Sequence, residues 1–496
     1  MGQEPKSITL ADLGLTAQSG READITGLSV DSRDVEPGHL FAALPGTSVH
    51  GAEFIQYAVR MGAGAILTDR IGAHIAEDVL RNSFVPLIIA EDPRQALAYC
   101  AALWFGHQPE VVVAVTGTNG KTSVATFTRQ IWEELGLSAV NLGTTGVEGS
   151  FQAPLHHTTP EPITLHRTLA AAAEAGVTHV AMEASSHGLA QRRLDGVQLT
   201  AAAFTNFSQD HLDYHENFED YFAAKAGLFR RVLSEDGVAV VHIDDPMGPE
   251  IADIALSKGQ DLLAVGRSEG SHLRIIGQRF DATGQDLRYT WNGEPFQARL
   301  ALIGGFQAEN ALMAAGLAIA AGTPAADAFA ALPSLRTVRG RMQLVTTRAN
   351  GASVFVDFAH TPAAIAAALQ ALRPHIMGRL IAIIGAGGDR DETKRPLMGA
   401  VAADHADVVI VTDDNPRSED PAEIRRAVME GCPNGTEVGD RAEAILRGVD
   451  ALQPGDALLI AGKGHETGQT IGDDVFPFDD AEQASIAVAA LDGRVL

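Results

Sequence analysis

The chain has 496 residues, of which 46% are hydrophobic, and a formal net charge of −26 at pH 7. This length predicts about three domains, and the apolar content excludes wholesale disorder. The acidic excess argues against a nucleic-acid binder, which needs a basic face, and against adsorption on anionic membranes. Cys100 and Cys432 lie far apart without a CxxC pattern, which excludes a disulfide framework or a cysteine-rich zinc site and fits a reducing cytoplasm.

Residues 1–108 are expected to form an N-terminal α/β domain. The first six residues lack the charged and apolar regions of a signal peptide, so we expect a cytoplasmic protein. Small polar residues around Val30, Ser32 and Gly46 suit recognition of a polar ligand, although turn chemistry accounts for them equally well. The predicted strands are 25–30, 40–44, 65–68 and 85–89, and the predicted helices are 53–61 and 92–105, followed by a linker at 107–109.

The central region, 109–336, opens on a phosphate-loop pattern. The β-branched run 111–115 predicts a buried strand, a glycine-rich turn follows, and a helix is expected from Thr122. Gly117 and Gly120 let the backbone approach a phosphate, and Lys121 can reach its outer oxygens. Val115 stands where the usual motif has its first glycine. An ordinary glycine turn is the alternative, but strand, turn and helix all favour phosphate binding.

Strands and helices alternate through the rest of this region, which predicts a doubly wound, mostly parallel sheet. Polar residues follow several predicted strands, where the ligands of such sheets bind. The alternating stretch 271–302 predicts antiparallel strands, and Asn310 is expected to open an alanine-rich core helix that stops too soon to span a membrane. The predicted strands are 139–142, 179–184 and 202–205, with a helix at 164–175 between the first two.

Oxygen donors near the phosphate loop suggest a magnesium site. Thr122 and Glu183, at adjacent strand ends, could share one ion, and His211 could help to hold a second. A hydrogen-bonded core histidine is the ordinary alternative for His211, and zinc is rejected because no third ligand of the right kind lies near His211 and His215. Lys225 stands among apolar neighbours, a pattern typical of a lysine that extends to water.

The third region, 337–496, repeats the strand–helix alternation. Asp357 ends a strand, where a carboxylate can accept from ribose hydroxyls or simply cap a turn, and Arg341 lies at the junction with the central region. The loop Asp414–Arg417 suits a zwitterion, because an acid can meet its ammonium and an arginine its carboxylate; a plain turn is the alternative. The predicted strands are 354–357, 380–384, 408–412 and 458–461, and Thr361-Pro362 predicts a helix start.

Nine motifs in order make the chain resemble the Mur ligases. They are GTNGKTS, the TTP loop, EASSHGLAQRR, NFSQDHLDYH, FQAENALMAA, VDFAHTP, GDRDETKRPLM, DNPR and GKGHE. Each motif alone is weak, whereas the ordered set runs through the central and third regions, from Gly117 to Glu466. The resemblance implies a three-domain α/β fold with an N-terminal UDP-binding domain (1–108), a central P-loop-type ligase domain (109–336) and a C-terminal Rossmann-like, amino-acid-binding domain (337–496).

The resemblance also implies roles for single residues. ATP would bind to Gly117, Thr118, Asn119, Gly120, Lys121, Thr122, Ser123, Asn310, Arg341 and Asp357. The UDP-linked substrate would bind to Val30, Ser32, Thr47, Ser48, Val49, His157, Thr158, Thr159, Ser185, Gln191 and Arg193. Diaminopimelate would bind to Arg390, Asp414, Asn415, Pro416, Arg417, Gly462 and Glu466. Catalysis would depend on Lys121, Glu183, His211 and Lys225, with magnesium held by Thr122, Glu183, His211 and a Lys225 carboxylated by carbon dioxide.

The implied function is an ATP-dependent amide ligase of peptidoglycan synthesis. It would add meso-diaminopimelate to the D-Glu carboxylate of UDP-MurNAc-L-Ala-D-Glu through an acyl phosphate, as a cytoplasmic monomer with no nucleic-acid or membrane partner. The rivals are a lysine-adding ligase of the same family, a folylpolyglutamate synthase, and a nucleotide-binding scaffold without catalysis. The arginine of the 414–417 loop speaks against the first, the N-terminal region against the second, and the catalytic set against the third.

Overall fold

The computed structural model describes residues 6–46, 49–155, 157–208 and 214–493. Three predicted site residues, Thr47, Ser48 and His211, therefore lie outside the described residues. The chain divides into two compact units, which are taken in turn below. The first comprises 1–121, 136–263 and 320–322, and the second comprises 122–135, 264–319 and 323–496.

The first unit begins with a parallel four-stranded sheet in the order β3-β4-β5-β6. Alternate residues of β4 and of the position after it face two cores, because Leu40 and Ala42 pack in one apolar cluster and Phe41 and Ala43 in another. The strands are β1 Ile8–Thr9, β2 Asp24–Ile25, β3 Gly27–Ser29, β4 His39–Ala42, β5 Ala65–Thr68 and β6 Leu87–Ile89. The helices are α1 Ile55–Arg60, α2 Arg70–Ile75, α3 Glu77–Asn82 and α4 Pro93–Phe105, with short 3-10 turns at Ser32–Asp34 and Gly51–Phe54.

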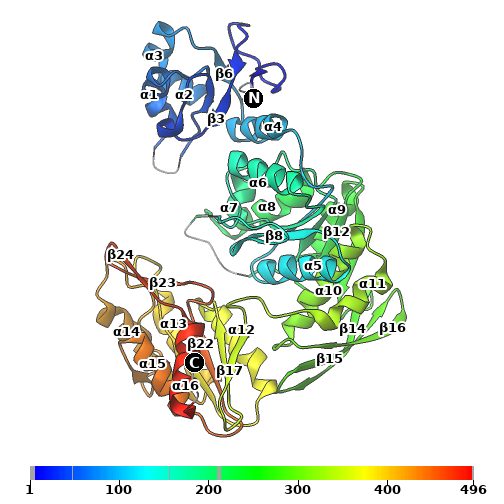
Figure 1. Ribbon diagram of the computed structural model, residues 1–496, viewed down its shortest axis with the longest axis vertical. Helices are drawn as coiled ribbons and strands as arrows, with labels where there is room; N and C mark the ends of the chain where they lie inside the picture. The colour runs from blue at the N-terminus through cyan, green and yellow to red at the C-terminus, as the bar shows by residue number, and fades with distance from the viewer. Residues whose placement is uncertain (1–5, 47–48, 156, 209–213, 494–496) are drawn as a thin grey trace. The chain divides into compact units, whose positions relative to one another are not determined.

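A larger sheet carries the phosphate-loop strand β7 near its middle. Its order is β16-β15-β14-β13-β12-β11-β7-β10-β8-β9, and β8, β10, β7, β11 and β12 run parallel. In the first unit, one face of these strands packs on α6, α8 and α9, and α4 lies against α6 (Figure 1). The elements are β7 Val111–Thr116, β8 Ala139–Gly143, β9 Gly146–Gly149, α6 Pro162–Glu174, β10 His179–Glu183, α7 Ser186–Ala190, β11 Ala201–Phe204, α8 Phe218–Gly227, a π-helical turn Leu228–Val232, β12 Val238–His242, α9 Gly248–Ser257 and β13 Asp261–Gly266.

The second unit contains the predicted antiparallel stretch and the alanine-rich helix. The prediction that Asn310 begins that helix is wrong, because Asn310 lies inside the helix and is buried. The chain turns earlier, at Gly304, whose φ is 101°. None of the helices in the described part of the chain combines the length and apolar character needed to cross a lipid bilayer. The elements are α5 Lys121–Glu134, β14 Leu273–Asp281, β15 Gly284–Trp291, β16 Glu294–Leu300, α10 Phe306–Ala320, α11 Ala325–Ala331 and a 3-10 turn Leu332–Ser334.

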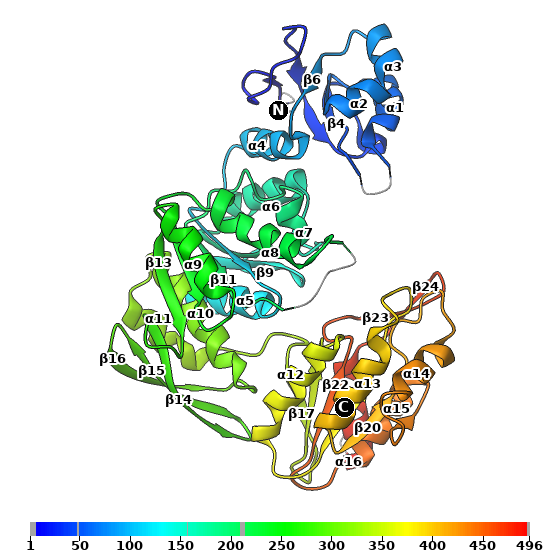
Figure 2. The same cartoon turned by 180° about the vertical axis from the view of Figure 1, so that it is seen from behind.

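The second unit also holds a six-stranded sheet in the order β17-β18-β22-β19-β20-β21, parallel except for β17. Helices α12, α13 and α14 cover one face, and α15 and α16 cover the other (Figures 1 and 2). The predicted α/β class with doubly wound sheets is thus confirmed. The elements are β17 Gln343–Thr347, β18 Ser353–Asp357, α12 Pro362–Leu372, a 3-10 turn Arg373–His375, β19 Leu380–Ile384, α13 Lys394–His405, β20 Val408–Val411, α14 Pro421–Met429, β21 Thr436–Glu437, α15 Arg441–Asp450, β22 Ala457–Ala461, β23 Gly468–Ile471, β24 Asp474–Pro477 and α16 Asp480–Asp492.

Candidate active site

The loop between β7 and α5 has the backbone of a phosphate cradle. Gly117 has φ 144° and Gly120 has φ 85°, conformations that side chains disfavour. A Cβ at Gly117 would lie 1.9 Å from the Thr205 hydroxyl oxygen, so only glycine fits there. The loop leads directly into α5, which begins at Lys121. The sequence pattern at 111–123 therefore does adopt the strand, turn and helix that phosphate binding requires.

Residues that follow the neighbouring strand β11 hold this loop in place by hydrogen bonds. The Asn119 amide donates to Asn206 Oδ1 over 2.9 Å, and the Thr205 hydroxyl donates to the Asn119 carbonyl over 2.6 Å. The Thr118 amide bonds the Asn206 carbonyl over 2.9 Å. Neither Thr205 nor Asn206 was assigned a role from sequence, although polar residues at the end of a strand beside β7 are a usable signal.

Lys121 curls back over its own loop. Its Nζ donates to the carbonyl oxygens of Gly117 over 3.0 Å and Thr118 over 2.9 Å. The ammonium therefore lies beside the turn that would hold a phosphate. A lysine in this place can exchange those carbonyl bonds for bonds to phosphate oxygens.

Lys225 is buried, with 1% of its surface exposed, and does not extend to water as its apolar surroundings suggested. Its Nζ donates to the Gly117 carbonyl over 2.7 Å and lies 4.4 Å from the ring centroid of Tyr221. The carbonyl and the aromatic face compensate for the lost water. A lysine of α8 thus contacts the phosphate loop from a position 108 residues along the chain.

Glu183 is buried at the end of β10, the strand beside β7. Its register partner on β7 is Val115, and its carboxylate accepts from the Thr144 amide over 2.8 Å and from the Thr144 hydroxyl over 3.3 Å. A Cβ at Gly143 would lie 2.1 Å from Glu183 Oε1, so the adjacent strand end is shaped around the carboxylate.

The donor types around the loop fit magnesium, which prefers oxygen ligands. The Glu183 carboxylate and the Thr122 hydroxyl are both of this kind, and both residues are buried. Within the described ranges there is no group of three or more His, Cys, Asp and Glu side chains that could hold an ion unaided. A magnesium ion here would therefore need further oxygen atoms, such as those of phosphates.

Five predicted UDP-substrate residues form one connected cluster beside Glu183. The Thr159 hydroxyl donates to the Glu183 carbonyl over 2.9 Å, and Arg193 donates to the Thr159 carbonyl over 2.5 Å and to Gln191 Oε1 over 2.8 Å. The Ser185 amide donates to the Thr159 hydroxyl over 3.0 Å. Thr158 joins the cluster through the Thr144 hydroxyl, 3.1 Å away. His157 is exposed, and no hydrogen bond among the described residues links it to the cluster.

The remaining predicted UDP-substrate residues lie in the N-terminal sheet. Val30 and Ser32 follow β3, and Val49 lies in the connection that follows the adjacent parallel strand β4. Val49 is 47% exposed and Ser32 is buried. The carboxyl ends of two adjacent parallel strands thus carry this second group.

The two predicted nucleotide residues at the start of the third region are neighbours. Both carboxylate oxygens of Asp357 are engaged, since they accept from the Met342 amide over 2.6 Å and the Ala359 amide over 2.9 Å. Burial raises the pKa of Asp357, and the Arg341 guanidinium opposes that rise. Arg341 itself lies 4.5 Å above the Phe358 ring. Asp357 therefore stabilises the turn after β18 by accepting from two backbone amides. The third predicted nucleotide residue of this group, Asn310, donates to Gln307 within α10.

The predicted amino-acid residues gather at one edge of the six-stranded sheet. The loops after β19, β20 and β22, three neighbouring strands, supply Arg390, the 414–417 loop, and Gly462 with Glu466. Arg417 donates to the Gly388 carbonyl over 2.7 Å. A Cβ at Gly462 would lie 2.4 Å from Asp414 Oδ2, and Asn415 donates to Glu466 over 2.9 Å. Asp414 thus lies against Gly462, Asn415 bonds Glu466, and Arg417 joins its loop to the loop after β19, while Arg390 is exposed.

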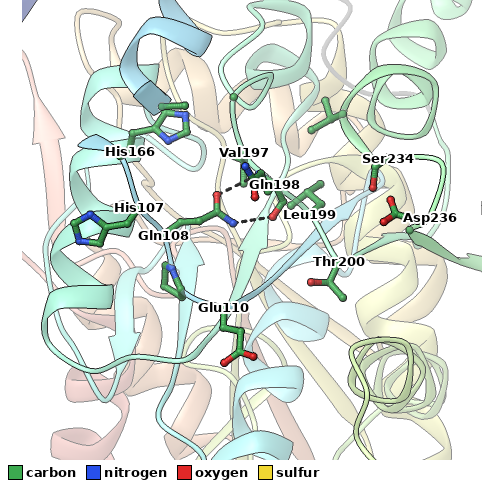
Figure 3. Close-up of a pocket in the computed structure, with 16 residues that line it drawn as sticks. His107, Gln108, Glu110, His166, Val197, Gln198, Leu199, Thr200, Ser234 and Asp236 are labelled. Atoms are coloured by element: carbon green, nitrogen blue, oxygen red, sulfur yellow. Dashed lines mark hydrogen bonds between the residues drawn. The ribbon is translucent and has the colours of Figure 1, made fainter. Parts of the chain in front are cut away.

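A cavity of about 780 Å³ lies elsewhere in the first unit (Figure 3). Its wall includes Glu110, Thr200 and Gly237, which precede β7, β11 and β12, so it opens at the amino ends of these strands. The Gln108 side chain crosses it and bonds the backbone of Gln198 in both directions, over 2.8 and 3.1 Å. Among the described residues lining it there is no predicted site residue, so the cavity is distinct from the phosphate loop.

Sequence profiles of a known family match three consecutive segments of this chain. Residues 24–104 match "Mur ligase family, catalytic domain", residues 115–318 match "Mur ligase middle domain", and residues 340–464 match "Mur ligase, glutamate ligase domain". The three matches together contain the predicted site residues described above, except Glu466, which lies two residues beyond the third match.

Individual proteins are similar over almost the whole chain. The UDP-N-acetylmuramoyl-L-alanyl-D-glutamate–2,6-diaminopimelate ligase of Bradyrhizobium diazoefficiens is 49% identical over 471 residues, 94% of this chain and 95% of that protein. A solved structure of a ligase with the same name is 31% identical, covers 98% of this chain and 99% of its own, and superposes with a TM-score of 0.72. Mycobacterium tuberculosis folylpolyglutamate synthase is 20% identical, covers 81% of this chain and 94% of its own, and shares the fold with a TM-score of 0.59.

Proposed function

The chain belongs to the Mur ligase family, and from that premise we propose that it joins meso-diaminopimelate to the D-Glu carboxylate of UDP-MurNAc-L-Ala-D-Glu at the expense of ATP. The geometric observation that carries the proposal is the contact of buried Lys225 with the phosphate loop at Gly117. An ordinary glycine turn does not require a buried lysine. Relatives named for the diaminopimelate reaction supply the substrate class.

We further propose the division into UDP-binding (1–108), ATP-binding (109–336) and amino-acid-binding (337–496) domains. The separate groups of polar residues at the strand ends of the N-terminal, central and C-terminal sheets support it. The cytoplasmic location and monomeric state expected from the sequence remain predictions.

ATP is proposed to bind with its phosphates on the 117–123 loop. The loop amides and the Lys121 ammonium would stabilise the charge on the phosphoryl group during its transfer to the D-Glu carboxylate. Transfer breaks the bond between the β-γ bridging oxygen and the γ-phosphorus, releases ADP and forms an acyl phosphate. The step is required because a free carboxylate is a poor acylating agent.

Magnesium, when bound, would neutralise negative charge on the phosphates. The residues proposed to hold it are Thr122, Glu183, His211 and Lys225 as a carbamate. The burial of Glu183 and Lys225 supports this choice, since a buried carboxylate and a carbamate both gain from a nearby cation.

The second substrate is proposed to bind at the edge formed by the loops after β19, β20 and β22. Asp414 and Glu466 would accept from an ammonium of diaminopimelate, and the guanidinium of Arg417 would pair with a carboxylate. A neutral amine of this substrate then attacks the acyl carbon, phosphate leaves, and an amide forms. The proton lost from the attacking nitrogen passes to solvent or to phosphate.

Phosphate release tests the proposal directly. The wild-type enzyme, with ATP, magnesium and UDP-MurNAc-L-Ala-D-Glu, is expected to release phosphate rapidly with meso-diaminopimelate and only slowly with L-lysine. Faster release with lysine would assign the chain to the lysine-adding reaction. Activity with a folate and glutamate would favour the folylpolyglutamate reaction, and ATP binding without release under all conditions would indicate a scaffold.

A further inference from the structure

Lys463 is fully buried between two loops of the proposed amino-acid site. No part of its side chain is exposed, and its Nζ donates to Asn415 Oδ1 over 3.0 Å and to Glu466 Oε2 over 3.1 Å. The Glu466 amide donates to the Lys463 carbonyl over 3.0 Å, and this turn brings the Glu466 side chain back beside Lys463. The cation therefore connects the loop after β20 to the loop after β22.

The bonds of Lys463 fix which way the Asn415 amide faces. Asn415 Oδ1 accepts from Lys463 and also from the Thr470 amide over 2.9 Å, so its NH₂ group is left to donate to Glu466 Oε2 over 2.9 Å. Because an ammonium can only donate, Lys463 excludes the flipped amide, whose NH₂ would face it. One orientation of the Asn415 side chain is thereby selected.

Lys463 also fixes the direction of the Glu466 carboxylate. The bonds from Lys463 and Asn415 both end on Oε2, and the side chain of Glu466 is 36% exposed. The second oxygen can therefore accept from a bound ligand. Because Lys463 is fully buried, its ammonium meets Oε2 away from water, and removing the lysine leaves that oxygen without its cation.

We propose that Lys463 is a positioning residue for the amino-acid substrate, acting through Asn415 and Glu466 without touching the substrate itself. This inference rests on the proposed function, because it assumes that the loops after β20 and β22 bind the amino acid. Its consequence is specific: loss of the cation weakens recognition of the amino acid and leaves recognition of ATP and of the UDP-linked substrate intact.

The test compares the Michaelis constants of all three substrates in Lys463→Met, which keeps the length of the stem and removes the charge. The KM for diaminopimelate is expected to rise roughly 10- to 100-fold, the value of one charged hydrogen-bond network, while the other two KM values stay within about twofold. Lys258→Met, at the end of α9 in the first unit, is the matched control and should behave as wild type. An unchanged diaminopimelate KM, or an equal rise in all three, would overturn the proposal.

A double variant covers the case in which Lys463→Met alone does not fold. Lys463→Met with Glu466→Gln removes both charges together, so no uncompensated carboxylate is left. Its diaminopimelate KM is expected to lie within about threefold of Glu466→Gln alone, because the lysine acts mainly through that carboxylate. If the two substitutions raised the KM for diaminopimelate independently, so that their fold-changes multiplied in the double variant, the proposed role of Lys463 would be contradicted. The wild-type assay separates the two failures, since absent phosphate release with diaminopimelate rejects the proposed function before Lys463 is considered.

Discussion

The amine of Lys225 lies 2.7 Å from the carbonyl oxygen of Gly117, so a buried lysine and the phosphate loop share one hydrogen bond. Carboxylation would replace that donor by a carbamate, which cannot donate to the carbonyl from its oxygens. The two forms of Lys225 therefore interact differently with the loop, and carbon dioxide becomes a condition of activity under the proposed function.

Removal of carbon dioxide is accordingly expected to lower activity. Wild-type enzyme in degassed, bicarbonate-free buffer should lose activity and recover it when bicarbonate is added, whereas Lys225→Ala should stay roughly 10²- to 10³-fold below wild type in both. Enzyme exchanged with ¹³C-bicarbonate should show a carbamate carbon signal that Lys225→Ala lacks. Activity of the wild type that is independent of carbon dioxide would reject the carbamate.

Gly117→Ala is expected to abolish ATP binding and to destabilise the protein. The new methyl group would overlap the Thr205 hydroxyl, and φ 144° is unfavourable for alanine. Gly259→Ala is the matched control, because Gly259 also has positive φ, 83°, but open space around its Cβ position. The control should lose only about 1 kcal/mol of stability and keep nucleotide affinity, as measured by thermal unfolding and nucleotide titration. Equal behaviour of the two variants would mean that the loop tolerates the overlap.

Arg417→Ala is expected to lose most activity with diaminopimelate. If its guanidinium pairs with the distal carboxylate, which lysine lacks, the loss is roughly 2–4 kcal/mol, or about 30- to 1000-fold in kcat/KM. The difference between diaminopimelate and lysine should shrink in the variant. Wild-type turnover and KM in Arg417→Ala would reject this assignment.

Acidification is expected to destabilise the first unit through His166. Burial lowers the pKa of His166 to about 4, and its Nε2 has no hydrogen-bond partner within the described residues. The unfolded chain, with a pKa near 6.5, takes up the proton first, so stability present above pH 6.5 is lost as the pH falls toward 4, by roughly 3 kcal/mol. His166→Leu should flatten the fall in melting temperature between pH 7 and 4.5. His74→Leu, an exposed control, should not flatten it.

Regular elements with long apolar runs were predictable from the sequence. The strand expected at 111–115 is β7, and the helix expected after Thr361 starts at Pro362, where the Thr361 hydroxyl accepts from the Ala364 amide. Period and capping are local properties, so a single sequence carries them. The start of α10 was misjudged because Asn310 resembles a cap, whereas the turn is made earlier by Gly304.

The partners of buried charges were not predictable. Lys225 has apolar neighbours in sequence, and its acceptor, Gly117, is brought to it only by the fold. The same holds for Lys463, whose acceptor Asn415 lies 48 positions away in the sequence and is brought to it by the fold. The neighbouring residues show that such a lysine has apolar surroundings in sequence. They do not show whether the folded chain places a hydrogen-bond acceptor beside its ammonium. The resemblance to a family pointed to Lys225 and gave no indication for Lys463.

Arg417 adopts φ 53°, a left-handed conformation that glycine accepts readily and that disfavours a side chain by about 1 kcal/mol. Substitution by glycine would therefore relax the main chain at the same position where it deletes the guanidinium. The same change would remove the bond to the Gly388 carbonyl. Under the proposed function, the left-handed backbone at residue 417 is therefore the conformational cost of holding a guanidinium that recognises the distal carboxylate.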